Sequence, residues 1–171
     1  LVVVDVQGKL AELMADRDAL FDGLRRLIQG AQALGLPLLV TEQNPTALGP
    51  TRPEFADLLA GVPRIPKLSF SCCGEPRFLE ALAVLGRRQV LLAGIEAHVC
   101  VYQTAVGLVE AGYHVEIVAD AVSSRAARNR DIGFQKARDA GAALTCMETA
   151  LFELLRTAEA PAFKAVLKAV K

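Results

Sequence analysis

The sequence predicts a three-layer α/β/α fold, in which helices cover both faces of a mainly parallel, Rossmann-like sheet of six strands. Short apolar runs rich in Val, Leu and Ile alternate along the chain with longer segments whose apolar residues recur at helical spacing. This alternation is typical of parallel strands joined by helical crossovers. A length of 171 residues suits one sizeable core and is short for two, so we expect a single domain over residues 1–171.

Three strands are predicted in the first half of the chain. Leu1–Val4 is a β-branched run typical of a buried parallel strand, and Pro37–Val40 and Arg64–Leu68 are the next two candidates. An apolar stripe at helical spacing predicts a helix over residues 16–34. A loop with three prolines and a short helix over residues 54–60 then lead to the third strand.

The second half repeats the alternation. Strands are predicted over residues 89–93, 114–119 and 143–146. Ser123 or Ser124 is a candidate N-cap for one of the intervening helices, and Gly141 ends it. The predicted helices cover residues 76–85, 101–111, 125–140 and 148–157.

Composition and charge exclude several classes of protein. Hydrophobic residues make up 53% and charged residues 22%, which argues against a disordered or fibrous protein. Nineteen basic and nineteen acidic residues balance, without a dense basic cluster, so we expect no nucleic-acid and no membrane partner. The high apolar content and zero net charge instead favour contact between copies of the chain, and we expect a homo-oligomer.

The four cysteines, Cys72, Cys73, Cys100 and Cys146, show no regular disulfide spacing. Without a signal-like N-terminus, reduced thiols in a cytoplasmic protein are the expectation. The chain begins at Leu1 inside a predicted strand and without an initiator Met, so we expect further residues upstream. Whether those include a targeting segment stays open.

Three chemically useful residues fall at one edge of the predicted sheet. Asp5 ends the first strand, Lys67 lies at the end of the third, and Cys100 follows the fourth after a tight turn that starts at Gly94. In a doubly wound sheet, ligands bind beyond the carboxyl ends of the strands, where the strand order reverses. The first and fourth strands are commonly neighbours there, so Asp5 and Cys100 are expected to approach each other.

Each of these residue types has a role in nucleophilic catalysis. A thiolate attacks, a carboxylate accepts and returns a proton, and an ammonium or a helix N-terminus lowers the pKa of a thiol such as Cys100. Each also has a structural alternative. Cys100 can be a small buried hydrophobe, Asp5 a turn former and Lys67 a solvated surface residue.

Other sites are less well supported by the sequence. His98 lies two positions before Cys100, so on a helix the two side chains would point apart, and His114 is expected at the opposite end of the sheet. Neither a Gly-rich dinucleotide loop nor a phosphate-binding loop is present, and the two histidines form no metal pattern. The vicinal pair Cys72-Cys73 is compatible with a redox or metal role but more simply with packing.

Asp5-Val-Gln7, Lys67 and the segment Gly94-Ile-Glu-Ala-His-Val-Cys-Val101 together resemble the isochorismatase-like cysteine hydrolase superfamily, which includes nicotinamidases and N-carbamoylsarcosine amidohydrolases. The resemblance covers nearly the whole chain. It implies a six-stranded parallel sheet, a catalytic triad of Asp5, Lys67 and Cys100, and a cis peptide bond between Ile95 and Glu96. It also implies an oxyanion hole made by the backbone N–H groups of Glu96 and Cys100.

Two departures from the family pattern narrow the expected activity. Thr41-Glu-Gln-Asn44 stands where nicotinamidases carry metal ligands, so we expect no metal and no cofactor. Isochorismatases proper lack the nucleophilic cysteine that Cys100 supplies.

The expected activity is therefore cleavage of an amide-type C–N bond in a small molecule through a Cys100 thioester. Ether hydrolysis of the isochorismatase kind, or a binding or oligomerisation role with little turnover, are the alternatives. The candidate substrate-binding residues are Gln7, Gln43, Asn44, Phe70 and Tyr102.

Overall fold

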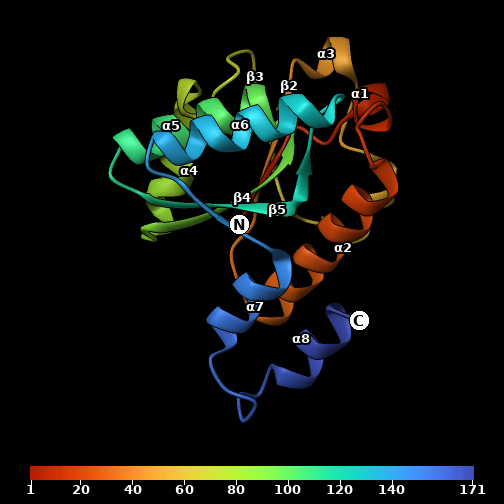
Figure 1. Cartoon of the computed structure of the whole chain (residues 1–171), viewed down its shortest axis with the longest axis vertical. Coiled ribbons are helices and arrows are strands. Elements are labelled where there is room, and N and C mark those ends of the chain that lie inside the picture. The colour runs from red at the N-terminus through yellow and green to blue at the C-terminus, as the bar shows by residue number, and fades with distance from the viewer.

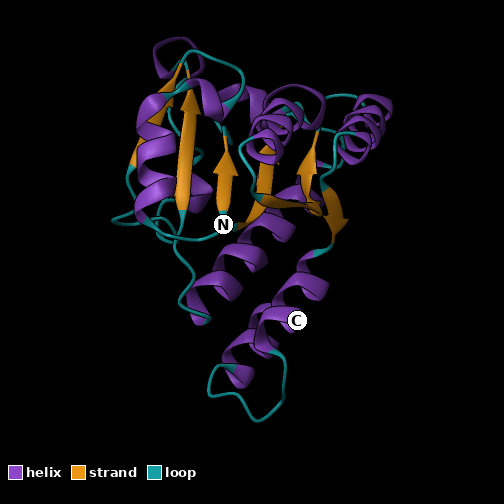
Figure 2. Ribbon diagram, turned by 90° about the vertical axis from the view of Figure 1, so that its left-hand side faces the viewer, coloured by secondary structure: helices purple, strands orange, loops and turns teal.

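The computed structural model describes all residues from Leu1 to Lys171 and has six parallel strands in one sheet, in the order β3-β2-β1-β4-β5-β6. The sheet lies between two layers of helices (Figures 1 and 2). The predicted three-layer α/β/α fold is therefore confirmed, with a sheet that is wholly parallel. The strands are β1 (Val2–Val4), β2 (Leu39–Gln43), β3 (Arg64–Lys67), β4 (Gln89–Ile95), β5 (His114–Ser123) and β6 (Ala143–Thr145).

Eight α-helices and three 3-10 or π-helical turns accompany the strands, with the last two helices beyond β6. None of the helices combines the length and the apolar character that crossing a membrane requires. The α-helices are α1 (Gly8–Glu12), α2 (Arg17–Ala33), α3 (Pro45–Leu48), α4 (Pro76–Val84), α5 (Tyr102–Glu110), α6 (Ala127–Asp139), α7 (Met147–Leu155) and α8 (Phe163–Ala169). The three turns are η1 (Pro53–Phe55), η2 (Cys72–Gly74) and η3 (Ala97–Val101), of which η3 is a π-helical turn.

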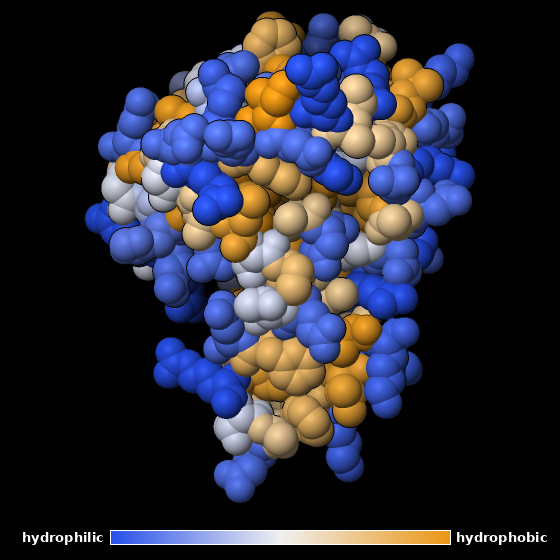
Figure 3. Space-filling view, in the orientation of Figure 1, coloured by the Kyte–Doolittle hydropathy of each residue, from blue (hydrophilic) through white to orange (hydrophobic).

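Each face of the sheet has its own hydrophobic core. In β1, Val3 belongs to the core beneath α2, α7 and α8, whereas Val2 and Val4 belong to the core beneath α4, α5 and α6. Successive side chains of a strand point to opposite faces, so a strand covered on both sides is apolar at every position. This explains why β1 is an unbroken valine run. Polar residues dominate the outer surface, and apolar ones show among them over the lower part, where α7 and α8 lie (Figure 3).

Three strands continue beyond their predicted ends. β4 extends to Ile95, and β2 and β5 are continued by segments that include polar residues. β2 extends through Thr41, Glu42 and Gln43, which pair in register with β3. β5 continues to Ser123, so the prediction that Ser123 or Ser124 caps the following helix is wrong. The N-cap of α6 is Ala126, which makes no side-chain cap bond.

Several short helices escaped prediction or differ from it. The predicted helix over residues 54–60 is a helical turn of only three residues, η1, followed by further turns. α1, α3 and α8 were not predicted. α8 forms beyond the predicted last helix because its apolar side packs on α2, and Val166 is fully buried there. Such tertiary contacts decide short helices more than intrinsic propensity does.

The strand order reverses between β1 and β4, and this places the candidate residues. Gly94 in β4 adopts a left-handed φ of +114°, and an added Cβ would lie 2.1 Å from the carbonyl oxygen of Val4. No other residue type allows β4 to approach β1 so closely at this point. The pairing of β4 with β5 also shifts register between Leu92 and Gly94, next to the reversal point.

Candidate active site

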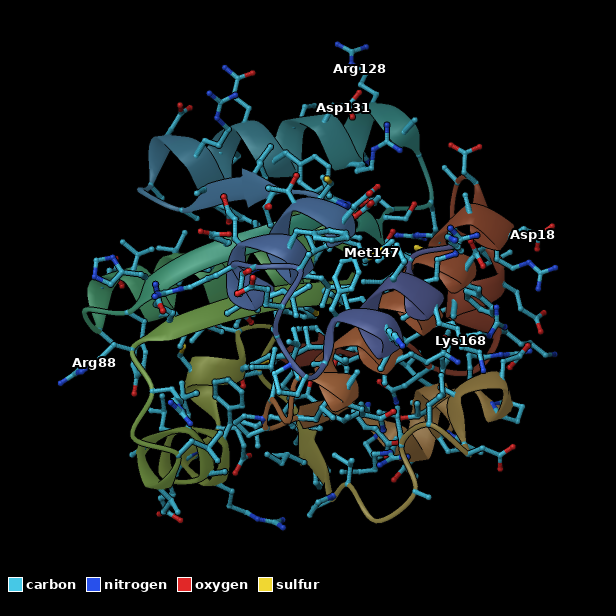
Figure 4. All side chains as sticks on the ribbon, turned by 90° about the horizontal axis from the view of Figure 1, so that it is seen from below. Asp18, Arg88, Arg128, Asp131, Met147 and Lys168 are labelled. Atoms are coloured by element: carbon cyan, nitrogen blue, oxygen red, sulfur yellow. The ribbon has the colours of Figure 1, made fainter.

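A buried ion pair joins the ends of β1 and β3. Asp5 follows β1 with a left-handed φ of 51°, and Lys67 is the last residue of β3. The Lys67 Nζ lies 2.7 Å from Asp5 Oδ2, and the side chains are 0% and 3% exposed. It is the one ion pair of the molecule with both side chains buried. Other charged residues, such as Asp18, Arg88 and Arg128, lie at the periphery (Figure 4).

The ammonium group of Lys67 is surrounded by acceptors from the protein itself. Besides Asp5, it donates to Gln43 Oε1 at 2.9 Å and to the carbonyl oxygens of Ser69 at 3.1 Å and Phe70 at 3.0 Å. Three N–H groups therefore serve four acceptors, and Lys67 has none left for a ligand. The structural alternative of a solvated surface lysine is ruled out.

Thr41 is a further partner of Asp5 that the sequence did not single out. Its hydroxyl donates to Asp5 Oδ1 at 2.7 Å, and the backbone N–H of Asp5 donates to the Thr41 carbonyl at 3.2 Å. The Asp5 carboxylate is thus held from both sides, by Lys67 on Oδ2 and by Thr41 on Oδ1.

Cys100 lies in η3, directly ahead of α5, and is only 7% exposed. The negative charge of Asp5 and the positive charge of Lys67 both act on its thiol. The structure therefore brings Asp5, Lys67 and Cys100 together, as the positions of their strands predicted.

The expectation of a lowered pKa for Cys100 is not met. Burial, followed by the negative charge of Asp5, raises the pKa of the Cys100 thiol to about 12, and the opposing effect of Lys67 is smaller. The physical reason is that Lys67 is already paired with Asp5, so little net positive charge reaches the sulfur. At neutral pH, Cys100 is therefore a protonated thiol under the influence of the Asp5 carboxylate.

The turn that carries Cys100 is fixed by backbone contacts. The Ile95–Glu96 peptide bond is cis, and the Glu96 carbonyl accepts from the N–H groups of Val99 at 3.1 Å and Val101 at 3.2 Å. The N–H of Glu96 itself donates to no group of the chain. On the outer side, Gly133 of α6 packs so closely that an added Cβ would lie 2.7 Å from backbone atoms of Ala97 and His98.

The side chain of Glu96 anchors the same turn to the start of the next crossover. Its Oε2 accepts from the backbone N–H of Arg125 at 2.9 Å and from Arg125 Nε at 3.1 Å.

The two histidines are not hydrogen-bonded to Asp5 or Lys67. His98 Nδ1 lies 3.0 Å from Ser124 Oγ, and His114 begins β5, at the end of the sheet opposite Asp5.

A family model describing the isochorismatase domain matches residues 1–149 of this chain. The chain belongs to the isochorismatase family. Among its relatives is the secreted isochorismatase effector Isc1 of Phytophthora sojae, which is 36% identical over 176 residues covering 100% of this chain and 83% of the relative.

Solved structures of isochorismatase-like proteins share the fold over almost the whole chain. The MAR1 ribonuclease from Caenorhabditis elegans has a TM-score of 0.93 and 39% identity, covering 99% of this chain and 87% of its own. YcaC from Pseudomonas aeruginosa, solved with hexane-2,5-diol and covalent acrylamide, has a TM-score of 0.91 and 26% identity, covering 98% and 86%.

The residues predicted to contact substrate in this isochorismatase-family chain fall into two groups. Gln43 and Asn44 lie at the end of β2 beside Lys67, since the Asn44 N–H donates to the Lys67 carbonyl at 2.8 Å. The side chain of Phe70 is 55% exposed in the same loop region. The Gln43 amide is already occupied, since its Oε1 accepts from Lys67 and its Nε2 donates to the Leu68 carbonyl, so Asn44 and Phe70 are the candidates for direct substrate contact.

Gln7 and Tyr102 are placed differently. Gln7 is fully buried, and its amide is taken up by the backbone of Gln43 and Gly49, so it holds the loop after β2 and offers no atom to a substrate. The ring of Tyr102 lies under Lys136 of α6, 5.0 Å from its Nζ. Direct substrate contact by Gln7 is therefore corrected to a supporting role.

The remaining cysteines are free thiols. Cys72 is buried with its Sγ 3.7 Å from Thr41 Oγ1, and burial raises its pKa to about 11. Cys73 packs against Gly107 of α5.

No group of three or more His, Cys, Asp and Glu side chains is arranged to hold a metal ion. Two surface hollows, of about 560 Å³ beside α6 and about 370 Å³ beside α2, do not include Cys100 in their lining.

Proposed function

We propose that this isochorismatase-family protein is a cysteine hydrolase that cleaves an amide-type C–N bond of a small molecule. The observation that supports it most is the convergence of a buried Asp5–Lys67 ion pair and the buried Cys100 thiol, whose pKa the charges of both residues influence. Burying two charges is costly, so a purely structural role gives little reason for the arrangement. A nucleophile beside an oriented base is the usual arrangement for covalent catalysis.

In the proposed mechanism, Asp5 moves one proton in each half of the reaction. As the Cys100 sulfur attacks the carbonyl carbon, its proton passes to the Asp5 carboxylate. Asp5 then returns this proton to the nitrogen of the leaving amine as the C–N bond breaks, which leaves a thioester. Water attacks the thioester, gives its proton to Asp5, and the proton returns to the departing sulfur of Cys100.

The raised pKa of Cys100 gives Asp5 a defined task in this scheme. A thiol with a pKa near 12 supplies almost no free thiolate at neutral pH. Attack therefore requires simultaneous proton transfer to Asp5, and Lys67 keeps that carboxylate in place. The backbone N–H of Glu96, which has no partner in the chain, is the proposed donor to the developing oxyanion, together with the N–H of Cys100.

Alkylation of Cys100 by acrylamide tests the nucleophile without knowledge of the substrate. YcaC, which is 26% identical, carries covalent acrylamide, which supports the choice of reagent. Because Asp5 can take the proton of Cys100 as the sulfur attacks, we expect Cys100 to react faster than Cys72, Cys73 and Cys146 between about pH 5 and about pH 9, as followed by peptide mass spectrometry. Lys67→Met should slow Cys100 and leave Cys146 unchanged.

Equal rates at Cys100 and the exposed Cys146, with no dependence on Lys67, would contradict the proposed nucleophile and favour the binding role. A positive result would justify a screen of small amides. With a vinyl ether added to that screen, ether cleavage that survives Cys100→Ala would point to ether hydrolysis of the isochorismatase kind. Activity abolished by Cys100→Ala with unchanged folding supports the thioester route.

Hydrolysis of RNA is a second candidate, because the C. elegans protein at 39% identity is described as a ribonuclease. The balance of nineteen basic and nineteen acidic residues and the full pairing of Lys67 favour a small molecule instead. RNA cleavage by purified protein that is lost in Cys100→Ala would reverse this preference.

We also propose that the protein is a cytoplasmic homo-oligomer. Free thiols suit a reducing compartment, although the P. sojae relative is named a secreted effector. Leu68 and Phe70, 76% and 55% exposed beside the site, are apolar surface that a second copy would cover. Light scattering coupled to size exclusion tests the oligomer, and a monomeric mass would contradict it.

A further inference from the structure

We propose that Thr41 is a positioning residue for the Asp5 base, through the hydrogen bond from its hydroxyl to Asp5 Oδ1. This inference rests on the proposed cysteine-hydrolase function. It concerns a residue that lies within β2 and whose side chain is fully buried, without contact to solvent.

The geometry leaves Thr41 as one of two side chains that fix the carboxylate plane. Asp5 Oδ1 accepts from Thr41 at 2.7 Å and Oδ2 accepts from Lys67 at 2.7 Å. The terminal torsion of an aspartate side chain is intrinsically broad, so a single donor would allow the group to rotate. With both donors in place, the carboxylate is held in one orientation beside the thiol of Cys100.

The chemistry of the two donors differs in a way that matters during turnover. An ammonium can only donate, whereas a hydroxyl can donate and accept. The Cys72 thiol donates to Thr41 Oγ1 at 3.7 Å. When Asp5 receives the proton of Cys100, this contact can reverse: the Thr41 hydroxyl turns its hydrogen towards Cys72 Sγ and accepts from the new carboxylic acid. Thr41 can therefore hydrogen-bond to Asp5 both when Asp5 is a carboxylate and when it is a carboxylic acid.

The experiment compares three variants by the pH dependence of Cys100 alkylation with acrylamide. Thr41→Val keeps the shape and removes the hydroxyl, and Thr41→Ser keeps the hydroxyl. Thr104→Val is the matched control, since Thr104 is an equally buried threonine whose Oγ1 accepts from the Cys72 N–H at 2.9 Å and forms no bond to Asp5.

The acid limb of the rate profile reports ionisation of the base. Loss of a donor to the ionised carboxylate should move this limb upward by about one pH unit in Thr41→Val and lower the plateau about tenfold. The acid limb of Thr41→Ser should lie at the same pH as that of the wild-type protein. Thr104→Val should lose stability without moving the limb.

An unchanged acid limb in Thr41→Val, or an equal shift in Thr104→Val, would overturn the role of Thr41 while the nucleophile itself stands. If Thr41→Val does not fold, Thr41→Cys replaces it: the weaker S–H donor must shift the limb in the same direction. Absence of preferential alkylation at Cys100 in the wild-type protein would reject the proposed function itself, and the role of Thr41 with it.

Discussion

The two sides of the site are held in different ways. On the base side, Asp5, Lys67 and Thr41 are fixed by an ion pair and hydrogen bonds between buried side chains. On the nucleophile side, the turn around Cys100 is fixed by backbone bonds to Glu96 and by the close approach of Gly133. The base side thus depends on buried charges, and the nucleophile side depends on backbone bonds and close packing. Damage to the base side should therefore cost stability first, and damage to the nucleophile side should cost reactivity first.

Lys67→Met should have the largest effect, because it leaves the buried Asp5 carboxylate without its counter-charge. Removal of one partner of a buried ion pair typically lowers the free energy of unfolding by about 3–5 kcal/mol. Urea denaturation followed by circular dichroism measures this loss. The control is Asp18→Asn, which breaks an exposed ion pair of Arg17 at 2.9 Å and should change stability by less than about 1 kcal/mol. Equal losses in the two variants would remove the distinction between the sides.

Gly133→Ala should act on the nucleophile side. A Cβ at this position would lie 2.7 Å from the backbone of Ala97 and His98, so the turn must move. We expect alkylation of Cys100 to fall about tenfold or more, with a loss of about 1–3 kcal/mol in the free energy of unfolding.

Gly107→Ala is the matched control for that substitution. Gly107 is also a helical glycine, but an added Cβ would meet side-chain atoms of Cys73 at 3.0 Å, which can rotate away. Reactivity of Cys100 should persist in this variant. A Gly133→Ala protein that alkylates like the wild type would show that packing of α6 does not hold the turn.

Alkaline pH probes a feature that the two sides share, a thiol whose ionisation is opposed by burial. The pKa of Cys100 is raised to about 12 and that of Cys72 to about 11, from an ordinary 9.0. The unfolded chain then loses these protons at lower pH than the native one, so their contribution to stability is complete below about pH 9 and declines above it. The melting temperature should fall between about pH 9 and about pH 11, and less steeply in Cys100→Ala and Cys72→Ala. Parallel curves for all three proteins would contradict the assigned pKa shifts.

Glu96→Gln should have the smallest effect of these changes. The amide oxygen of glutamine can still accept from the N–H and Nε of Arg125, and the side chain of Arg125 is 58% exposed, so solvent screens the lost charge. We expect the free energy of unfolding to change by less than about 1 kcal/mol. A loss as large as that of Lys67→Met would mean that charge holds the nucleophile side as well.

Much of the fold was predictable because parallel strands covered on both faces must be apolar at every position, as β1 is. The meeting of Asp5, Lys67 and Cys100 followed from the shared carboxyl edge of β1, β3 and β4. The polar extension of β2 was not predictable in this way, because Thr41, Glu42 and Gln43 read as loop residues. Their role depends on partners from distant parts of the chain.

The contribution of Thr41 and Gly133 could not be found from sequence for the same reason. A threonine in a strand and a glycine in a helix are common. Only the tertiary structure shows that Thr41 contacts Asp5 and that Gly133 packs against the Cys100 turn. The pKa of Cys100 was predicted in the wrong direction because the sequence shows a lysine and a helix start but not their neutralisation by Asp5 or the burial of the sulfur.

The left-handed backbone of Asp5, with φ of 51°, has a consequence for directed evolution. Apart from glycine, only asparagine and aspartate adopt this conformation readily. A library randomised at position 5 should therefore return few folded members besides Asn, Asp and Gly, whatever activity is selected. Position 44 shares this constraint, because Asn44 also has a left-handed φ, of 37°. Phe70 has no positive φ and is 55% exposed, so position 70 carries no such constraint. New specificities are therefore best sought at position 70, with the chemistry at position 5 left intact.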